Sequence, residues 1–203
     1  MTCKARAFAL PVLVISLGSG CSLLQPKPKQ RGTSGGQTEP AARSEPQPAN
    51  DGQRFALDPR YLPLTELVER PAMPGASNVS ATTISPTVYV PDLQRWLEKR
   101  PPGSVMFESV LRHEQVHAKR QEAYGVDPWV KRYLNDTAFM WAEEQAGWYE
   151  EIKHMGYGGL RRSAEDLAKI LSGYQNLKGS MVSYAEALAW AKQVLDGSWR
   201  PPN

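Results

Sequence analysis

The arrangement of apolar and helix-capping residues in the second half of the chain predicts four helices. They cover about 104–124, 127–155, 163–171 and 183–196. Each begins at residues typical of helix starts: Ser104, Asp127 with Pro128, Ser163 with Asp166, and Ser183 with Glu186. Glycines follow three of these helices and mark where they end: Gly125, Gly156 and Gly197.

The segment before these helices has the composition of a small β element. Residues 78–90 are rich in β-branched and aromatic side chains, which predicts one or two short strands. The strand over 87–90 lies between Pro86 and Pro91. Because proline cannot donate a hydrogen bond to a neighbouring strand, we expect this strand at the edge of a sheet.

The folded part of the chain is expected to begin near Phe55. Just downstream, Leu64, Leu67 and Val68 indicate a further short helix. Helices dominate this part, and the strands are few and short. The predicted fold is therefore α+β and mostly α, a small helical domain with a β element over 55–203.

Residues 21–54 have the composition of a linker. Proline, glycine, glutamine and serine dominate after Leu24, and apolar side chains are almost absent. Such a segment buries too little surface to offset its ordering entropy, so we expect a disordered tether. About thirty flexible residues give a root-mean-square reach of about 30 Å. That reach would hold a folded domain clear of a membrane surface.

The N-terminus has the pattern of an export signal. A basic start leads into an apolar run over 7–17, about eleven residues, whereas a membrane-spanning helix needs roughly twenty. Small residues at 18–20 then precede Cys21. This order resembles a bacterial lipoprotein signal, which implies a signal peptide over 1–20 and a lipid attached to Cys21. An ordinary signal peptide cleaved at the same place is the alternative.

Cysteine content and charge add to this picture. The only other cysteine is Cys3, so Cys21 has no partner for an internal disulfide after cleavage. Ser22 resembles the sorting pattern of Gram-negative outer-membrane lipoproteins, which implies an outer-membrane anchor on the periplasmic face.

The net charge is only +3 over 203 residues, with no basic stripe, so we exclude nucleic-acid binding.

One motif in the chain carries recognisable chemistry. Residues 111–120 read LRHEQVHAKR, which places His113, Glu114 and His117 on a predicted helix. The two histidines lie four positions apart, hence about 40° apart on one face of the helix, where both can bind a single metal ion. Glu114 flanks that position and can take a proton from metal-activated water. The expected cofactor is Zn²⁺.

A catalytic zinc ion usually has a third protein ligand, and the next helix offers two glutamates for it. Periodicity does not separate Glu143 from Glu144, because both have small or apolar neighbours one turn away. The region 110–150 resembles the zincin metallopeptidases in which a downstream glutamate completes the site. The resemblance implies Glu143 as the ligand, because Ala146 follows it at the family's spacing. Glu144 is the second choice.

The resemblance implies a zinc metallopeptidase, with Glu114 as the catalytic residue and a peptide or protein of the envelope as substrate. It also implies that an upstream strand, here 87–90, pairs with extended substrate. His154, Tyr157 and Tyr133 are candidate donors to the transition state.

Two alternatives stay open. The first is a non-catalytic, metal-stabilised envelope lipoprotein that binds a partner, with a fourth ligand such as His154 closing the site. The second is a metal-free helical lipoprotein in which the histidines are incidental.

Overall fold

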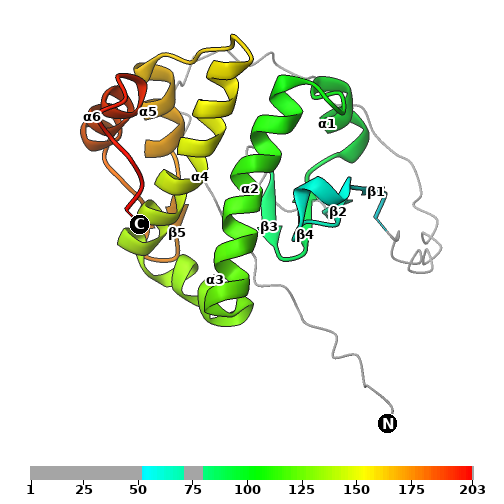
Figure 1. Cartoon of the computed structure of the whole chain (residues 1–203). Coiled ribbons are helices and arrows are strands. Elements are labelled where there is room, and N and C mark those ends of the chain that lie inside the picture. The colour runs from blue at the N-terminus through cyan, green and yellow to red at the C-terminus, as the bar shows by residue number, and fades with distance from the viewer. Residues whose placement is uncertain (1–51, 71–79, 203) are drawn as a thin grey trace, which may run out of the picture. The chain divides into compact units, whose positions relative to one another are not determined.

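The structure, a computed structural model, describes residues 52–70 and 80–202. This part of the chain is mostly helical with a small sheet, which confirms the predicted fold class (Figure 1). The signal peptide, Cys21 and nearly all of the predicted tether lie outside the described residues. Within the two described ranges, no helix is both long enough and apolar enough to cross a membrane.

A four-stranded sheet forms the N-terminal end of the described chain. Its strands are β1 (Arg54–Ala56), β2 (Glu66–Glu69), β3 (Thr82–Ile84) and β4 (Thr87–Val90), arranged in the order β1-β2-β4-β3. β2 and β4 are parallel, and the other two pairs are antiparallel.

Two sequence predictions for this region are wrong. The apolar residues around Leu67 form strand β2 rather than a helix, because Leu67 pairs with Val88 and both side chains are fully buried in the sheet. β4 is an inner strand, not an edge strand. Pro86 and Pro91 flank β4 without occupying it, so its own four residues keep the amide groups that the ladder needs. The edge position beside it belongs to β3.

The helices follow the sheet in sequence. They are α1 (Leu93–Lys99), α2 (Val105–Tyr124), α3 (Val126–Asn135), α4 (Thr137–Tyr157), α5 (Ala164–Ser172) and α6 (Tyr184–Leu195). A 3₁₀ turn (Pro59–Tyr61) precedes β2, and a two-residue strand pair, β5 (Gln175–Asn176) and β6 (Gly179–Ser180), separates the last two helices. The predicted caps at Ser104, Ser163 and Ser183 are confirmed, and Ser183 with Glu186 forms a complete capping box.

The long helix predicted from Asp127 is instead two helices. Asp136 interrupts it, because its side chain accepts a hydrogen bond from the backbone amide of Phe139 and starts α4. Asp127 and Pro128 lie in the first turn of α3, which Gly125 opens with a positive φ of 92°. The chain therefore turns once more than predicted before α4 packs along α2.

Two apolar clusters hold the fold together. In Figure 1, α2 and α4 lie between the sheet on one side and α5 and α6 on the other. One cluster joins the sheet to α1 and α2, with Leu67, Val88 and Leu111 fully buried. The other joins α4 to α5 and α6 through residues such as Leu167 and Trp190. α2 and α4 pack more extensively than any other pair of elements. The interface between these two helices is where the predicted site residues meet.

Candidate metal centre

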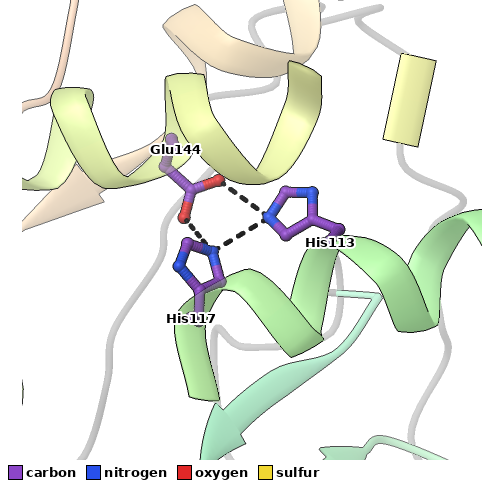
Figure 2. A group of neighbouring side chains, drawn as sticks. All are labelled: His113, His117 and Glu144. Atoms are coloured by element: carbon purple, nitrogen blue, oxygen red, sulfur yellow. Dashed lines mark hydrogen bonds and ion pairs between the residues drawn. The ribbon is translucent and has the colours of Figure 1, made fainter. Parts of the chain in front are cut away.

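The two histidines of the motif lie on the buried face of α2. His113 and His117 are each 5% exposed, and their Nε2 atoms lie 3.0 Å apart (Figure 2). Their spacing of four residues places the imidazoles about one helical turn apart, edge to face, with both rings turned toward α4. The predicted arrangement of the histidine pair is therefore present in the fold.

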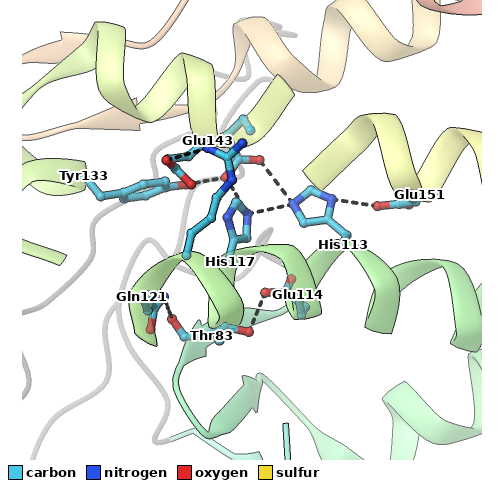
Figure 3. A network of polar contacts seen from close by, with 10 residues as sticks. Thr83, His113, Glu114, His117, Gln121, Tyr133, Glu143 and Glu151 are labelled. Atoms are coloured by element: carbon cyan, nitrogen blue, oxygen red, sulfur yellow. Dashed lines mark hydrogen bonds and ion pairs between the residues drawn. The ribbon is translucent and has the colours of Figure 1, made fainter. Parts of the chain in front are cut away.

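Glu144, and not Glu143, is the glutamate that α4 brings to this pair. Its Oε2 lies 3.5 Å from Nε2 of His113 and its Oε1 lies 3.4 Å from Nε2 of His117 (Figure 2). The carboxylate of Glu143 points elsewhere and pairs with Nη1 of Arg120 at 3.0 Å (Figure 3). The structure thus reverses the order in which the resemblance placed the two glutamates.

The helical phase of α4 explains the correction. Positions 144, 147, 148 and 151 form one stripe of an α-helix, and their residues contact or face the histidines: Glu144, Gly147, Trp148 and Glu151. Glu143 lies about 100° around the axis from Glu144. The spacing to Ala146 belongs to a different stripe and leads to Glu143, whose carboxylate pairs with Arg120 instead.

His113, His117 and Glu144 form a buried group that could hold a metal ion, and their candidate ligand atoms all lie within 4.8 Å of one another. Zinc bonds of about 2.0–2.2 Å at tetrahedral angles place neighbouring ligand atoms about 3.3–3.6 Å apart. Each oxygen of Glu144 lies within that range of one histidine nitrogen, at 3.4 and 3.5 Å, and the two nitrogens are somewhat closer together at 3.0 Å. Two imidazoles and a carboxylate are also the donor set that zinc accepts.

The surrounding side chains hold this group in place. Nδ1 of His113 lies 3.0 Å from Oε2 of Glu151, so a proton on Nδ1 leaves the Nε2 lone pair free for a metal (Figure 3). The hydroxyl of Tyr133 donates a hydrogen bond to Oε1 of Glu144. Oε2 of Glu144 is buried and has no hydrogen-bond partner among the described residues. A cation at this point would satisfy that oxygen.

Burial and neighbouring charges shift the pKa values of several side chains in and around this group. Burial disfavours a charge on Glu144, but its contacts with His113 and His117 outweigh burial and hold its pKa well below the usual value. Burial likewise lowers the pKa of His113, but Glu144 and Glu151 outweigh it and raise the pKa well above the usual value. Burial and the nearby charge of Glu144 raise the pKa of Tyr133. The group thus keeps a carboxylate and a phenol hydroxyl in the same buried place.

Glu114 lies beside this group rather than in it. It is 6% exposed, and Oγ1 of Thr83 on β3 donates a hydrogen bond of 2.7 Å to its Oε2 (Figure 3). Gln121 lies seven residues, about two turns, farther along α2. It fixes β3 by donating to the carbonyl of Thr83 at 2.9 Å and accepting from the amide of Ser85 at 2.8 Å. The sheet and α2 together therefore set the direction of the glutamate that the motif marks as catalytic.

A cavity of about 300 Å³ opens on these residues. His113, Glu114, His117 and Glu144 all line it, and so does the segment 80–84, which contains β3. Trp129, Tyr133 and Trp148 add aromatic walls. Some of the aromatic residues of α3 and α4 thus face the cavity, while others such as Tyr149 belong to the core.

Of the three candidate donors to the transition state, only one lies at the cavity. Tyr133 lines the cavity. Tyr157 is 79% exposed, and neither it nor His154 lines the cavity. His154 is also outside the group of potential metal ligands found among the described residues. This placement removes the fourth ligand that the closed, structural site would have used.

Sequence reasoning missed the partners of the motif: Thr83, Gln121 and Glu151. Glu151 had a usable signal, because it lies seven residues after Glu144 and therefore on the same stripe of α4. Thr83 and Gln121 had none, because their contacts depend on how β3 lies against α2.

Gly147 lets His113 approach α4. A Cβ atom built at this glycine would lie 2.6 Å from both Cδ2 and Nε2 of His113, closer than two such atoms can pack. Any side chain at this position must therefore displace the imidazole or separate the two helices.

We expect Gly147→Ala to weaken zinc binding at least about tenfold, because a ligand atom shifted by a few tenths of an ångström leaves its geometry. The added methyl group should also cost about 1–3 kcal/mol through overpacking, against a gain of about 1 kcal/mol in helix propensity. Gly156→Ala is the matched control on α4, because nothing lies within 4 Å of its Cβ position. Titration calorimetry and thermal unfolding measure both effects; equal zinc affinity in the two variants would contradict the packing argument.

Comparison of the chain with protein-family models, with curated proteins and with solved structures finds no match. The chemistry of the site is therefore argued from its residues and geometry.

Proposed function

We propose that this protein is a zinc-dependent peptide hydrolase of the cell envelope. The observation that carries the proposal is the buried group of His113, His117 and Glu144, which lines one cavity together with Glu114. A structural metal site needs its ligands but no free carboxylate beside them. Here Glu114 is held next to the group without belonging to it, as a catalytic base must be.

His113, His117 and Glu144 would hold the ion, with Glu151 fixing the His113 ring and Tyr133 orienting Glu144. A zinc ion held there would polarise the substrate carbonyl and lower the pKa of water in the cavity. Glu114 accepts the proton of the attacking water and delivers it to the amine nitrogen as the C–N bond breaks. Thr83 orients that carboxylate through its hydrogen bond.

Extended substrate would lie along β3 rather than β4. β4 pairs with β2 on one side and β3 on the other, so it has no open edge. Among the described strands, β3 pairs only with β4, and 80–84 lines the cavity. Because Gln121 occupies the carbonyl of Thr83, a substrate strand would use the backbone that precedes Thr83.

The place of action follows from the N-terminal sequence. The proposed signal peptide and lipid on Cys21 would anchor the domain to the outer membrane, on its periplasmic face. The tether predicted from the composition of 21–54 would let the cavity reach peptides or proteins of the envelope.

Zinc content tests the proposal directly. We expect the purified chain to hold a single zinc ion and to unfold about 10 °C lower after chelation, because an ion present at about a thousandfold its Kd adds about 4 kcal/mol of stability. Hydrolysis of a quenched fluorescent peptide library should stop with the chelator and return with zinc. A chain that takes up no zinc at neutral pH would end the proposal and leave a metal-free helical lipoprotein.

A further inference from the structure

Two arginines line the cavity beside the candidate metal centre. Arg100 directly follows helix α1, and Arg162 lies in the loop that leads into α5. They reach the cavity from different elements, neither of which carries the metal ligands. The fold thus gathers positive charge at one place from segments more than sixty residues apart.

Each of these two side chains has a hydrogen-bond donor without an acceptor among the described residues. Nε of Arg100 and Nε of Arg162 are both buried and have no hydrogen-bond partner in the described part of the chain. Neither arginine takes part in the ion pairs found among the described residues. Buried charged donors without partners are costly, so a ligand that supplies acceptors would bind favourably.

The guanidinium of Arg100 is also held in position. It lies over the ring of Trp96, 5.1 Å from the centroid, and Trp96 is itself buried. Burial lowers the pKa of Arg100, the charge of Glu151 raises it, and the charge of Arg162 lowers it. Glu151 forms no ion pair with either arginine among the described residues, and its Oε2 contacts Nδ1 of His113 at 3.0 Å.

Charge balance in the cavity points to an anion. Its lining includes the carboxylates of Glu114, Glu144 and Glu151 and the guanidiniums of Arg100 and Arg162. Together these groups carry one net negative charge. A divalent cation at the proposed centre would change that to one net positive charge. A single carboxylate on the ligand would restore neutrality and meet the planar donors of arginine.

We propose that Arg100 and Arg162 form a subsite for a carboxylate group of the peptide substrate. The inference rests on the proposed function and adds a substrate class to it: peptides with a free C-terminus or an acidic side chain near the scissile bond. The cavity of about 300 Å³ is at the small end for ligand pockets, so the carboxylate lies within one or two residues of that bond.

Matched zinc-binding peptides test the subsite without any need for turnover. Each probe carries a hydroxamate followed by one or two residues, and ends in a free carboxylate, in a carboxamide, or in a carboxamide after an aspartate. Titration calorimetry on the zinc-loaded full chain measures their Kd. We expect at least one carboxylate probe to bind about tenfold or more tightly than the neutral one, and the better of the two identifies the source of the carboxylate.

The Arg100→Gln/Arg162→Gln variant should lose this preference and keep its zinc content and its affinity for the neutral probe. Arg161→Gln, at the exposed neighbouring position, is the matched control and should keep the preference. If the double variant does not fold, the two single variants replace it, each with a reduced preference. Equal affinity of all three probes for zinc-loaded wild type would overturn the subsite while the proposed function stands. Absence of zinc from wild type would overturn both.

Discussion

Glu144→Gln is expected to abolish zinc binding at micromolar metal, whereas Glu143→Gln leaves it intact. Both oxygens of Glu144 face the histidine pair, at 3.4 and 3.5 Å, while Glu143 pairs with Arg120. The amide of glutamine keeps the size of the side chain but removes the negative charge that a zinc ligand supplies. Changes to the residues that surround a metal ligand lower metal affinity about ten- to hundredfold, and loss of the ligand itself should lower it more. We therefore expect zinc affinity to fall by more than about a hundredfold.

The two variants control each other, because they change adjacent residues of one helix in the same way. Glu143→Gln breaks an ion pair between a buried carboxylate and an arginine that is 38% exposed, so it should cost about 1–3 kcal/mol. Zinc content by mass spectrometry and Kd by calorimetry measure the outcome, and circular dichroism checks the fold. Zinc lost with Glu143→Gln but kept with Glu144→Gln would restore the order that the resemblance gave and refute the arrangement in Figure 2.

The case of the two glutamates shows how far the sequence could lead. Helical spacing fixed the relation of His113 to His117, because both residues belong to one helix. The choice between Glu143 and Glu144 depends on how α4 is rotated against α2. That rotation depends on contacts between helices, such as the close approach of Gly147 to His113. Local pattern alone does not contain this information.

Chain connections show the same limit. Asp136 followed by Thr137 is a helix-start signal, but the prediction followed the stronger signal of Asp127 with Pro128 and continued that helix through Asp136. The prolines around β4 indicated an edge strand, yet tertiary pairing placed β4 inside the sheet. Local signals therefore predicted the helix starts at Ser104, Ser163 and Ser183. They missed β1 and α1 and took β2 for a helix. They did not predict which strand lies next to the motif, so Thr83 and its bond to Glu114 became visible only in the fold.

Glu114→Gln should keep the zinc ion and lose the reaction. Glu114 is not among the grouped ligands, so zinc content and zinc affinity should match wild type. Glutamine preserves the shape of the side chain and an oxygen that can accept the hydrogen bond from Thr83, but it cannot take a proton from water. Loss of a general base lowers kcat by about 10²–10⁴, with KM nearly unchanged.

The measurement combines zinc analysis with initial rates on peptides that the wild type cleaves in the fluorescent library. Glu122→Gln is the matched control, since Glu122 lies on the same helix and is exposed. Zinc-dependent cleavage that persists in Glu114→Gln would show that another group acts as the base. Zinc-loaded wild type that cleaves nothing, with a variant that behaves identically, would instead favour the metal-stabilised, partner-binding lipoprotein. The effect of this one substitution therefore separates catalysis from structure, because Glu114 lines the cavity without belonging to the group that could hold the metal.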